Sequence, residues 1–204
     1  ASGVPLDSFA TNTLFAPLGM KHSGYLPFSP TLTNDLPQNL PVGVGAVAPT
    51  EELAGPVILR GVVHDPTSRR LGGVAGHAGL FTTAEDLARF CRMLLNGGTL
   101  EGKTILQPET VRLMTSVQTP PGLPRRGLGW DIDSPYAGPR GNVFPLGSYG
   151  HTGWTGTSLW IDPFSQTFLI FLSNRNHPTE EGNVVALRRE LGTLAAEAVE
   201  SFNF

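Results

Sequence analysis

The spacing of apolar positions predicts four helices. The first covers about Leu6–Leu18, and Gly19 stands where such a helix would end. The second covers Thr83–Asn96 and carries the clearest signals. A third is expected to begin at Pro108, a favourable first-turn residue, and a fourth to cover Val184–Phe202. Long amphipathic helices therefore occur at both ends and in the middle of the chain.

The helix expected after Thr83 has start and stop signals of its own. Thr83 and Asp86, like Thr82 and Glu85, have the three-residue spacing of a capping box. Gly97-Gly98 would end the helix. Its apolar stripe is predicted to consist of Leu87, Phe90, Cys91, Leu94 and Leu95. In the last helix, the residues predicted to face inward are Leu187, Leu191, Leu194, Ala195, Ala198 and Phe202.

After Gly122 the pattern changes to short strands. Gly127–Ile132, Thr155–Ile161 and Thr167–Ser173 read as strands, and Asp162–Gln166 as the hairpin loop between the last two. Residues 42–65 alternate short apolar runs with Gly and Pro, which indicates extended segments with turns.

These elements predict an α+β fold, in which a short antiparallel sheet has the C-terminal helix packed on it. We expect one incomplete domain over residues 1–204. Residues 1–121 would form a helical and loop-rich region, and residues 122–204 the sheet with its closing helix. Three strands make a thin sheet for a chain of 204 residues, which indicates that strands are missing.

Composition narrows the function classes. The chain has 25 glycines and 18 prolines, about one residue in five, so long loops are expected. Its formal net charge is −3, which gives no basic field for a nucleic acid. No apolar run approaches the ~18 residues of a membrane span.

The segment Tyr149-Gly-His-Thr-Gly-Trp-Thr-Gly156 is the first candidate for chemistry. His151 could exchange a proton near neutral pH, and the Thr152 hydroxyl could bind a carboxylate or carbonyl. Gly153 would let a substrate approach the backbone. The alternative is a glycine-rich entry to a strand with a surface histidine.

A second candidate is Gly72-Gly-Val-Ala-Gly-His-Ala-Gly-Leu80, which leads into the capped helix. Its backbone could form an anion-binding nest around His77. It lacks the Lys-Ser/Thr ending of a phosphate loop and the context of a dinucleotide fingerprint. A structural turn is the alternative.

The third candidate is Val62-Val-His-Asp65. Adjacent residues on an extended chain point in opposite directions, so a His64–Asp65 dyad is disfavoured. The alternative is that one of the two side chains is buried and holds a loop.

Metal, cofactor and thiol chemistry find no support in the sequence. No two of the five histidines have His-x-x-x-His spacing, so we expect no metal and no cofactor. Cys91 is expected in the core. Arg69-Arg70 and Arg125-Arg126 are expected to be solvated pairs.

Four stretches together point to a family. They are Phe15-Ala-Pro-Leu-Gly-Met-Lys-His-Ser-Gly24, Ala48-Pro-Thr-Glu51 with Arg60-Gly-Val-Val-His-Asp65, Leu71–Ala88, and Gly150-His-Thr-Gly-Trp-Thr-Gly156. In this order they resemble the serine β-lactamase and penicillin-binding-protein superfamily, in the branch of class C β-lactamases, DD-carboxypeptidases and related esterases. The last stretch is similar to that family's third motif, Lys/His-Thr/Ser-Gly.

The chain departs from this family in its first two motifs. Leu18 and Leu100 stand three residues before the two lysines, Lys21 and Lys103, so no Ser-x-x-Lys is present. None of the three tyrosines begins Tyr-x-Asn. We therefore expect the chain to be the C-terminal portion of a longer serine hydrolase, without family activity on its own.

The resemblance implies a role for each matching residue. His151 would supply a positive charge or a hydrogen bond beside the substrate's carboxylate, and Thr152 would bind that carboxylate or the acyl group. Gly153 would complete the motif, and the Trp154 backbone N–H would be one oxyanion donor. His64, Asp65 and His77 would lie in the substrate-binding region. An unperturbed His is largely neutral at pH 7 whereas Lys is charged, which favours a peptidase or esterase over an efficient β-lactamase.

The resemblance also bears on partners. It implies a small-molecule or peptide substrate, a missing N-terminal segment and a bacterial periplasmic or extracytoplasmic location. The competing hypothesis is a non-catalytic binding module that self-associates, for example as a dimer through an exposed sheet edge. A hydrolase with an internal serine is disfavoured, because no Gly-x-Ser-x-Gly occurs.

Overall fold

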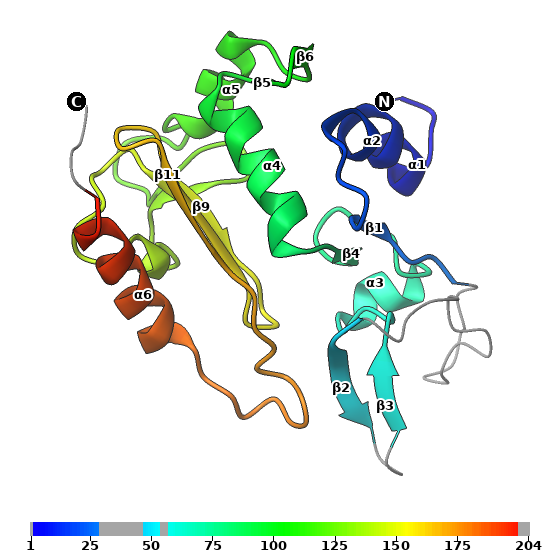
Figure 1. Ribbon diagram of the computed structural model, residues 1–204. Helices are drawn as coiled ribbons and strands as arrows, with labels where there is room; N and C mark the ends of the chain where they lie inside the picture. Colours follow the sequence, from blue (N-terminus) through cyan, green and yellow to red (C-terminus); the bar gives the residue numbers. More distant parts are fainter. Residues whose placement is uncertain (1, 29–46, 54–56, 200–204) are drawn as a thin grey trace. The chain divides into compact units, whose positions relative to one another are not determined.

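The computed structural model describes residues 2–28, 47–53 and 57–199 (Figure 1). They form two compact units. The first lies within residues 1–86 and 174–182, and the second within residues 87–173 and 183–204. Among the described residues, no helix has both the length and the apolar character needed to cross a membrane.

The first unit contains short helices and two small antiparallel sheets. β1 pairs with β4, and β2 pairs with β3. The elements are α1 (Leu6–Ala10), the π-helical turn η1 (Thr11–Phe15), α2 (Ala16–Leu18), β1 (Gly24–Tyr25), β2 (Pro49–Leu53), β3 (Val57–Arg60), α3 (Pro66–Arg70) and β4 (Leu80–Phe81). The extended segments expected over residues 42–65 are confirmed for β2 and β3; residues 42–46 and 54–56 lie outside the described part.

The first helical stretch ends as its sequence predicts. Gly19 has φ +67°, a left-handed conformation that ends α2. The buried side chains are Phe15 and Leu18, at 4% and 1% exposure, whereas Leu6 and Phe9 are more than a third exposed. This helix therefore packs through its C-terminal end.

The start of α4 (Ala84–Leu95) forms half of the expected capping box. The Asp86 N–H donates to the Thr83 hydroxyl at 3.3 Å. The Asp86 carboxylate instead accepts from the His22 N–H at 2.7 Å and from the Ser23 hydroxyl at 2.8 Å. The acid thus ties the helix start to the turn after Gly19, which local spacing alone does not reveal.

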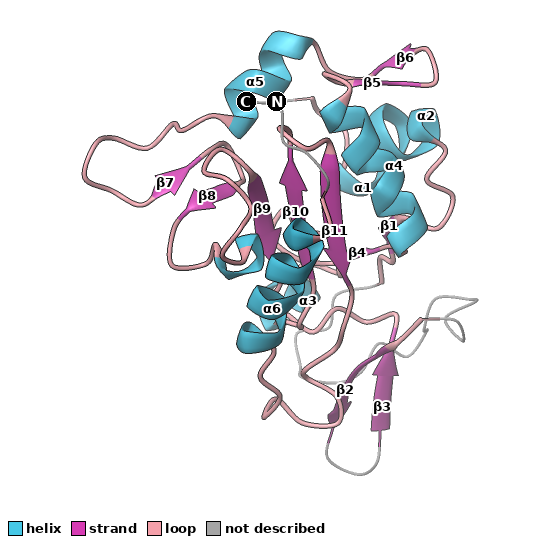
Figure 2. Cartoon of the chain, turned by 60° about the vertical axis from the view of Figure 1, so that its left-hand side comes forward, coloured by secondary structure: helices cyan, strands magenta, loops and turns pink. Residues whose placement is uncertain are grey.

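The second unit is built on one antiparallel sheet of five strands, ordered β11-β10-β9-β8-β7 (Figure 2). Besides most of α4, its elements are β5 (Thr99–Leu100), β6 (Lys103–Thr104), α5 (Pro108–Thr115), β7 (Arg125–Arg126), β8 (Asp131–Asp133), the 3₁₀ turn η3 (Gly138–Arg140), β9 (Tyr149–Thr152), β10 (Ser158–Asp162), β11 (Thr167–Phe171) and α6 (Val185–Glu197).

The sheet confirms the predicted α+β class and corrects its detail. The strand expected over Thr155–Ile161 begins at Ser158, and Tyr149–Thr152 forms a separate strand, β9. The β10–β11 hairpin is as expected, because Asp162 accepts from the Ser165 N–H at 2.9 Å in its loop. The sequence pattern did not predict β9, because this strand contains Gly150 and glycine has a low strand propensity.

The two faces of this sheet carry different residues. Tyr149 pairs with Ile161, and Gly150 pairs with Trp160, so each pair lies on its own face. Tyr149 lies edge-on to Trp130, with ring centroids 5.2 Å apart, and Trp130 stacks with Phe90 of α4. Trp160 instead packs with Phe144, Ala137 and Ala196 of α6. α4 and α6 therefore cover opposite faces.

The buried stripe of α4 contains Cys91, Leu94 and also Met93, which the pattern did not include. Cys91 is fully buried, as expected of a core residue. Burial raises the pKa of its thiol to about 12, so it carries no charge at neutral pH.

The inward face predicted for α6 is confirmed for Ala195, which packs against the core, but is wrong for Leu187, Leu194 and Ala198. Leu187 and Leu194 are 43% and 54% exposed, whereas Arg188, Gly192 and Ala196 are buried. Phe202 lies outside the described residues. The reason is close backbone packing: a Cβ on Gly192 would lie 2.0 Å from the Pro139 carbonyl oxygen. Small residues face the loop at η3, and the leucines are turned away from it.

We predict that Gly192→Ala destabilises the chain by about 1–3 kcal/mol, because the new methyl group overlaps backbone that cannot move aside cheaply. The gain in helix propensity, at most ~1 kcal/mol, offsets only part of this loss. Urea unfolding measures the difference. Gly138→Ala is the matched control, since its Cβ would meet nothing within 4 Å. A Gly192→Ala chain as stable as wild type would contradict this packing.

Candidate functional site

The residues expected to form the third motif lie at the end of β9 and in the turn that follows it. His151 pairs with Leu159, and Thr152 pairs with Ser158, the last pair of the β9–β10 ladder. His151 is exposed, and Thr152 is partly buried. By strand alternation, His151 shares the face of Tyr149, and Thr152 shares the opposite face with Gly150.

The turn after β9 is closed by backbone and side-chain hydrogen bonds. The Gly153 N–H donates to the Thr157 carbonyl at 2.7 Å, and the Gly156 N–H donates to the Gly153 carbonyl at 3.2 Å. Arg188 of α6 donates through Nη2 to the carbonyls of both Gly153 and Thr157, at 2.7 and 2.6 Å. The turn is therefore fixed on both sides of Trp154, whose side chain is 67% exposed.

The His151 ring contacts the backbone beside it. Its Nδ1 lies 2.9 Å from the Thr152 carbonyl oxygen. A carbonyl oxygen can only accept, so Nδ1 carries the proton in this contact. In the neutral ring Nε2 is then the acceptor, and on protonation it becomes a donor suited to a carboxylate.

Tyr149 of the same strand is a core residue. It is 2% exposed. Burial, with a smaller contribution from Cys91, holds the pKa of Tyr149 well above its usual value. Its phenol stays protonated at neutral pH and does not replace the tyrosine of the family's second motif.

The loop over Gly72–Leu80 is tightly packed. A Cβ on Gly79 would lie 2.2 Å from the Gly73 carbonyl oxygen, and both glycines have positive φ. The Ser68 hydroxyl donates to the Ala78 carbonyl at 3.0 Å. Gly79 is thus needed for the close approach of the two backbone segments, whereas a Cβ on Gly76 would meet nothing within 4 Å.

His77 projects from this loop toward Asp65. Its Nε2 lies 2.8 Å from an Asp65 carboxylate oxygen, and the same oxygen accepts from the Ser68 N–H at 2.6 Å. Asp65 is therefore the N-cap of α3. Burial alone would raise the pKa of Asp65, but hydrogen bonds from Ser68 and His77, with the charge of His77, outweigh it and lower the pKa.

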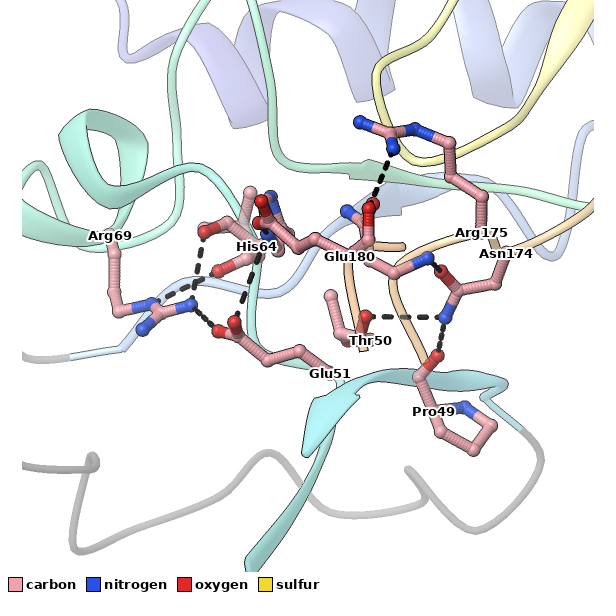
Figure 3. Close-up of polar contacts among 10 residues, drawn as sticks. Pro49, Thr50, Glu51, His64, Arg69, Asn174, Arg175 and Glu180 are labelled. Atoms are coloured by element: carbon pink, nitrogen blue, oxygen red, sulfur yellow. Dashed lines mark hydrogen bonds and ion pairs between the residues drawn. The ribbon is translucent and has the colours of Figure 1, made fainter. Parts of the chain in front are cut away.

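His64 takes part in a separate polar cluster, shown in Figure 3. Its Nε2 contacts the Glu180 carboxylate and lies 3.8 Å from Glu51. Glu51 is also paired with Arg69, whose guanidinium donates to the carbonyl oxygens of Val63 and His64. His64 and Asp65 thus take different partners.

The same cluster also joins β2 to the segment that begins at Asn174. The Asn174 amide donates to the carbonyls of Pro49 and Thr50 (Figure 3), and Arg175 donates to the Glu180 carbonyl at 3.1 Å. Residues 174–182 therefore belong to the first unit although they follow the sheet of the second in sequence.

The expectation of solvated arginine pairs holds for Arg70 and Arg125, which are exposed, but is wrong for Arg69 and Arg126. Arg69 is bonded as described above, and Arg126 lies 2.7 Å from the carboxylate of Asp131, which is 1% exposed. The sequence pattern does not indicate these acidic partners, because Glu51 lies 18 residues from Arg69, and Glu180 lies 116 residues from its partner His64.

The structure thus divides the sequence-predicted residues between the units. His151, Thr152, Gly153 and Trp154 form one continuous turn in the second unit. His64, Asp65 and His77 lie in the first unit, in two distinct contacts. Within the described ranges, no cluster of three His, Cys, Asp or Glu side chains could hold a metal ion.

Comparison with known proteins gives one consistent result. A family model described as "Beta-lactamase" matches residues 1–193. A protein of Escherichia coli (strain K12), named "Putative D-alanyl-D-alanine carboxypeptidase", is 33% identical over 193 residues. The match covers 86% of this chain and 41% of that protein, so the chain spans about two fifths of the curated relative's length.

Solved structures share the fold. A beta-lactamase from Mycobacterium bovis matches 97% of this chain and 58% of its own, with a TM-score of 0.58 at 20% identity. Simvastatin synthase from Aspergillus terreus matches 98% of this chain and 52% of its own, with a TM-score of 0.63 at 19% identity. At these identities the likeness concerns the fold alone.

We predict that Asp65→Ala lowers stability at pH 7 by about 1 kcal/mol, because α3 loses its cap, while Asp65→Asn keeps most of it. The folded-state pKa of Asp65 is below the usual 3.8, so the stability from its ionised form is present above pH 4 and lost as pH falls through the folded-state pKa. Thermal unfolding at pH 7 and pH 3 measures this. A wild-type advantage over Asp65→Ala that grows on acidification would contradict it.

Proposed function

Because the chain belongs to the beta-lactamase family, we propose that it supplies the third active-site motif of a serine acyl hydrolase. The Ser-x-x-Lys and Tyr-x-Asn motifs do not occur in its sequence. The proposed enzyme therefore takes its nucleophilic serine and proton-transfer groups from a segment outside these 204 residues. The substrate class is a lactam, a D-alanyl peptide or an ester.

The observation that carries the proposal is the geometry at the end of β9. His151, Thr152, Gly153 and Trp154 follow one another where the strand leaves the sheet, and four hydrogen bonds fix the turn. An oxyanion donor is effective when it is held in place before the reaction, and a bonded turn on a buried sheet meets this requirement.

The proposed chemistry is acyl transfer in two steps. The serine oxygen attacks the substrate carbonyl and forms the acyl C–O bond. The C–N or C–O bond to the leaving group then breaks, and the leaving group takes up the serine proton through the missing base. Water hydrolyses the ester and returns the serine. In both steps the Trp154 N–H donates to the carbonyl oxygen as it becomes negative.

His151 and Thr152 would bind the substrate's carboxylate. The Thr152 hydroxyl can donate at any pH, whereas His151 adds a positive charge only when protonated, since its Nδ1 proton is already directed to the Thr152 carbonyl. The name of the E. coli relative supports a D-alanyl-D-alanine peptide as the substrate within this class.

We predict that the 204-residue chain forms no adduct with a fluorescent penicillin or a fluorophosphonate, because the nucleophile is absent. The natural protein extended upstream to include Ser-x-x-Lys should label stoichiometrically, as seen by intact mass. In it, His151→Ala should slow acylation by a carboxylate-bearing substrate ~10–100-fold, the effect of losing one hydrogen bond to a charged group.

His22→Ala is the matched control, since His22 is exposed in the first unit and holds Asp86 only through its backbone N–H. A stoichiometric adduct on any serine of the 204-residue chain would overturn the proposal. Labelling of neither protein, with a stable self-associated chain at dilute concentration, would favour the non-catalytic module.

A further inference from the structure

Arg188 of α6 holds the Gly153–Trp154 peptide by a hydrogen bond to the Gly153 carbonyl. Arg188 is 8% exposed, and its Nη2 lies 2.7 Å from the Gly153 carbonyl oxygen and 2.6 Å from that of Thr157. These two carbonyls stand at the two ends of the turn that contains Trp154. One buried guanidinium nitrogen therefore fixes both ends of this turn at once.

Because the peptide group is planar, the contact that holds the Gly153 carbonyl also sets the direction of the Trp154 N–H. The only cis peptide in the described part of the chain is His177–Pro178, so Gly153–Trp154 is trans. In a planar trans peptide the C=O and the following N–H point in opposite directions. With the Gly153 carbonyl held toward Arg188, the Trp154 N–H is directed away from α6. The sheet face opposite α6 is the one that carries His151.

The hydrogen bond to Gly153 also changes the strength of the donor. A bond from a cation to a carbonyl is charge-assisted and polarises the whole peptide group. Polarisation along connected hydrogen bonds strengthens the next bond by ~10–30%. The Trp154 N–H is thus both oriented and made a better donor by the same contact.

The local sequence leaves little freedom for another arrangement. A Cβ on Gly153 would lie 2.3 Å from the Thr157 hydroxyl oxygen, so a larger residue there would force the Thr157 side chain to move. Glycine has the widest backbone freedom and would otherwise let this peptide rotate. The backbone contact with Thr157 and the side-chain contact with Arg188 supply the restraint that Gly153 lacks.

We propose that Arg188 is a positioning residue, which orients and polarises the Gly153–Trp154 peptide so that the Trp154 N–H serves as an oxyanion donor. This inference rests on the proposed function for its catalytic meaning. It does not require Arg188 to touch the substrate. A residue with only a structural role would hold α6 to the turn without setting the direction of one N–H bond.

The first test needs no activity. In the 204-residue chain, NMR residual dipolar couplings report the direction of the Trp154 N–H, and hydrogen exchange reports its protection. Arg188→Met, which keeps the aliphatic volume, should change the coupling of the Trp154 N–H, while the coupling and protection of the Trp160 N–H in β10 stay as in wild type. Arg189→Met, at the exposed neighbouring position on α6, is the matched control and should change neither.

The second test uses the natural protein extended upstream. Arg188→Met should lower the acylation rate ~10–100-fold, below the ~10²–10³ of losing a whole oxyanion donor, with the substrate dissociation constant unchanged. Arg188→Lys, which keeps a cationic donor, should recover part of the rate. Thermal unfolding of each variant shows that the fold is retained.

The outcomes separate the two proposals. A wild-type protein that does not acylate contradicts the proposed function, and with it the catalytic role of Arg188. An active wild type with an unchanged Trp154 coupling in Arg188→Met contradicts the positioning role alone, as does a loss of substrate affinity with an unchanged acylation rate. A rotated N–H together with a slowed acylation rate supports the inference.

Discussion

The arrangement of the second unit depends on the packing of Trp160 against Gly150. Trp160 is 1% exposed, and its indole N–H donates to the Ser148 hydroxyl at 3.0 Å. A Cβ on Gly150 would lie 2.2 Å from the indole ring, so only glycine fits opposite it. This contact sets the register of β9 on β10. A slip by one residue would move His151 to the other face of the sheet.

The position of the turn after β9 depends on this register. α6 packs on the face that carries Trp160, with Gly192 close to the loop at η3. Backbone contact at Gly192 brings Arg188, one helical turn earlier, to the carbonyls of Gly153 and Thr157. A tryptophan, two glycines and one arginine thus fix the third motif. The first unit has a polar arrangement of its own, in which Asp65 caps α3 and His64 pairs with Glu180.

The sequence predicted the elements whose signals are local. The helix after Thr83, its end at Gly97-Gly98 and the β10–β11 hairpin depend on caps and turns that neighbouring residues encode. It failed where distant parts of the chain decide the outcome. The buried face of α6 follows from the approach of Gly192 to Pro139, not from the positions of its leucines. The proposed motif His151–Trp154 is marked by its own residues, but its contact with Arg188 is not, because no sequence pattern distinguishes a buried arginine on a helix from an exposed one.

The most direct test of this account is a crystal structure of the upstream-extended protein with a penicillin bound as its acyl ester. The account predicts the acyl carbonyl oxygen at about 2.7–3.1 Å from the Trp154 nitrogen, with the Gly153 carbonyl still held by Arg188. It also places the ligand carboxylate at Thr152 and His151. An acyl carbonyl held by other donors, or a Gly153–Trp154 peptide turned the opposite way, would contradict it.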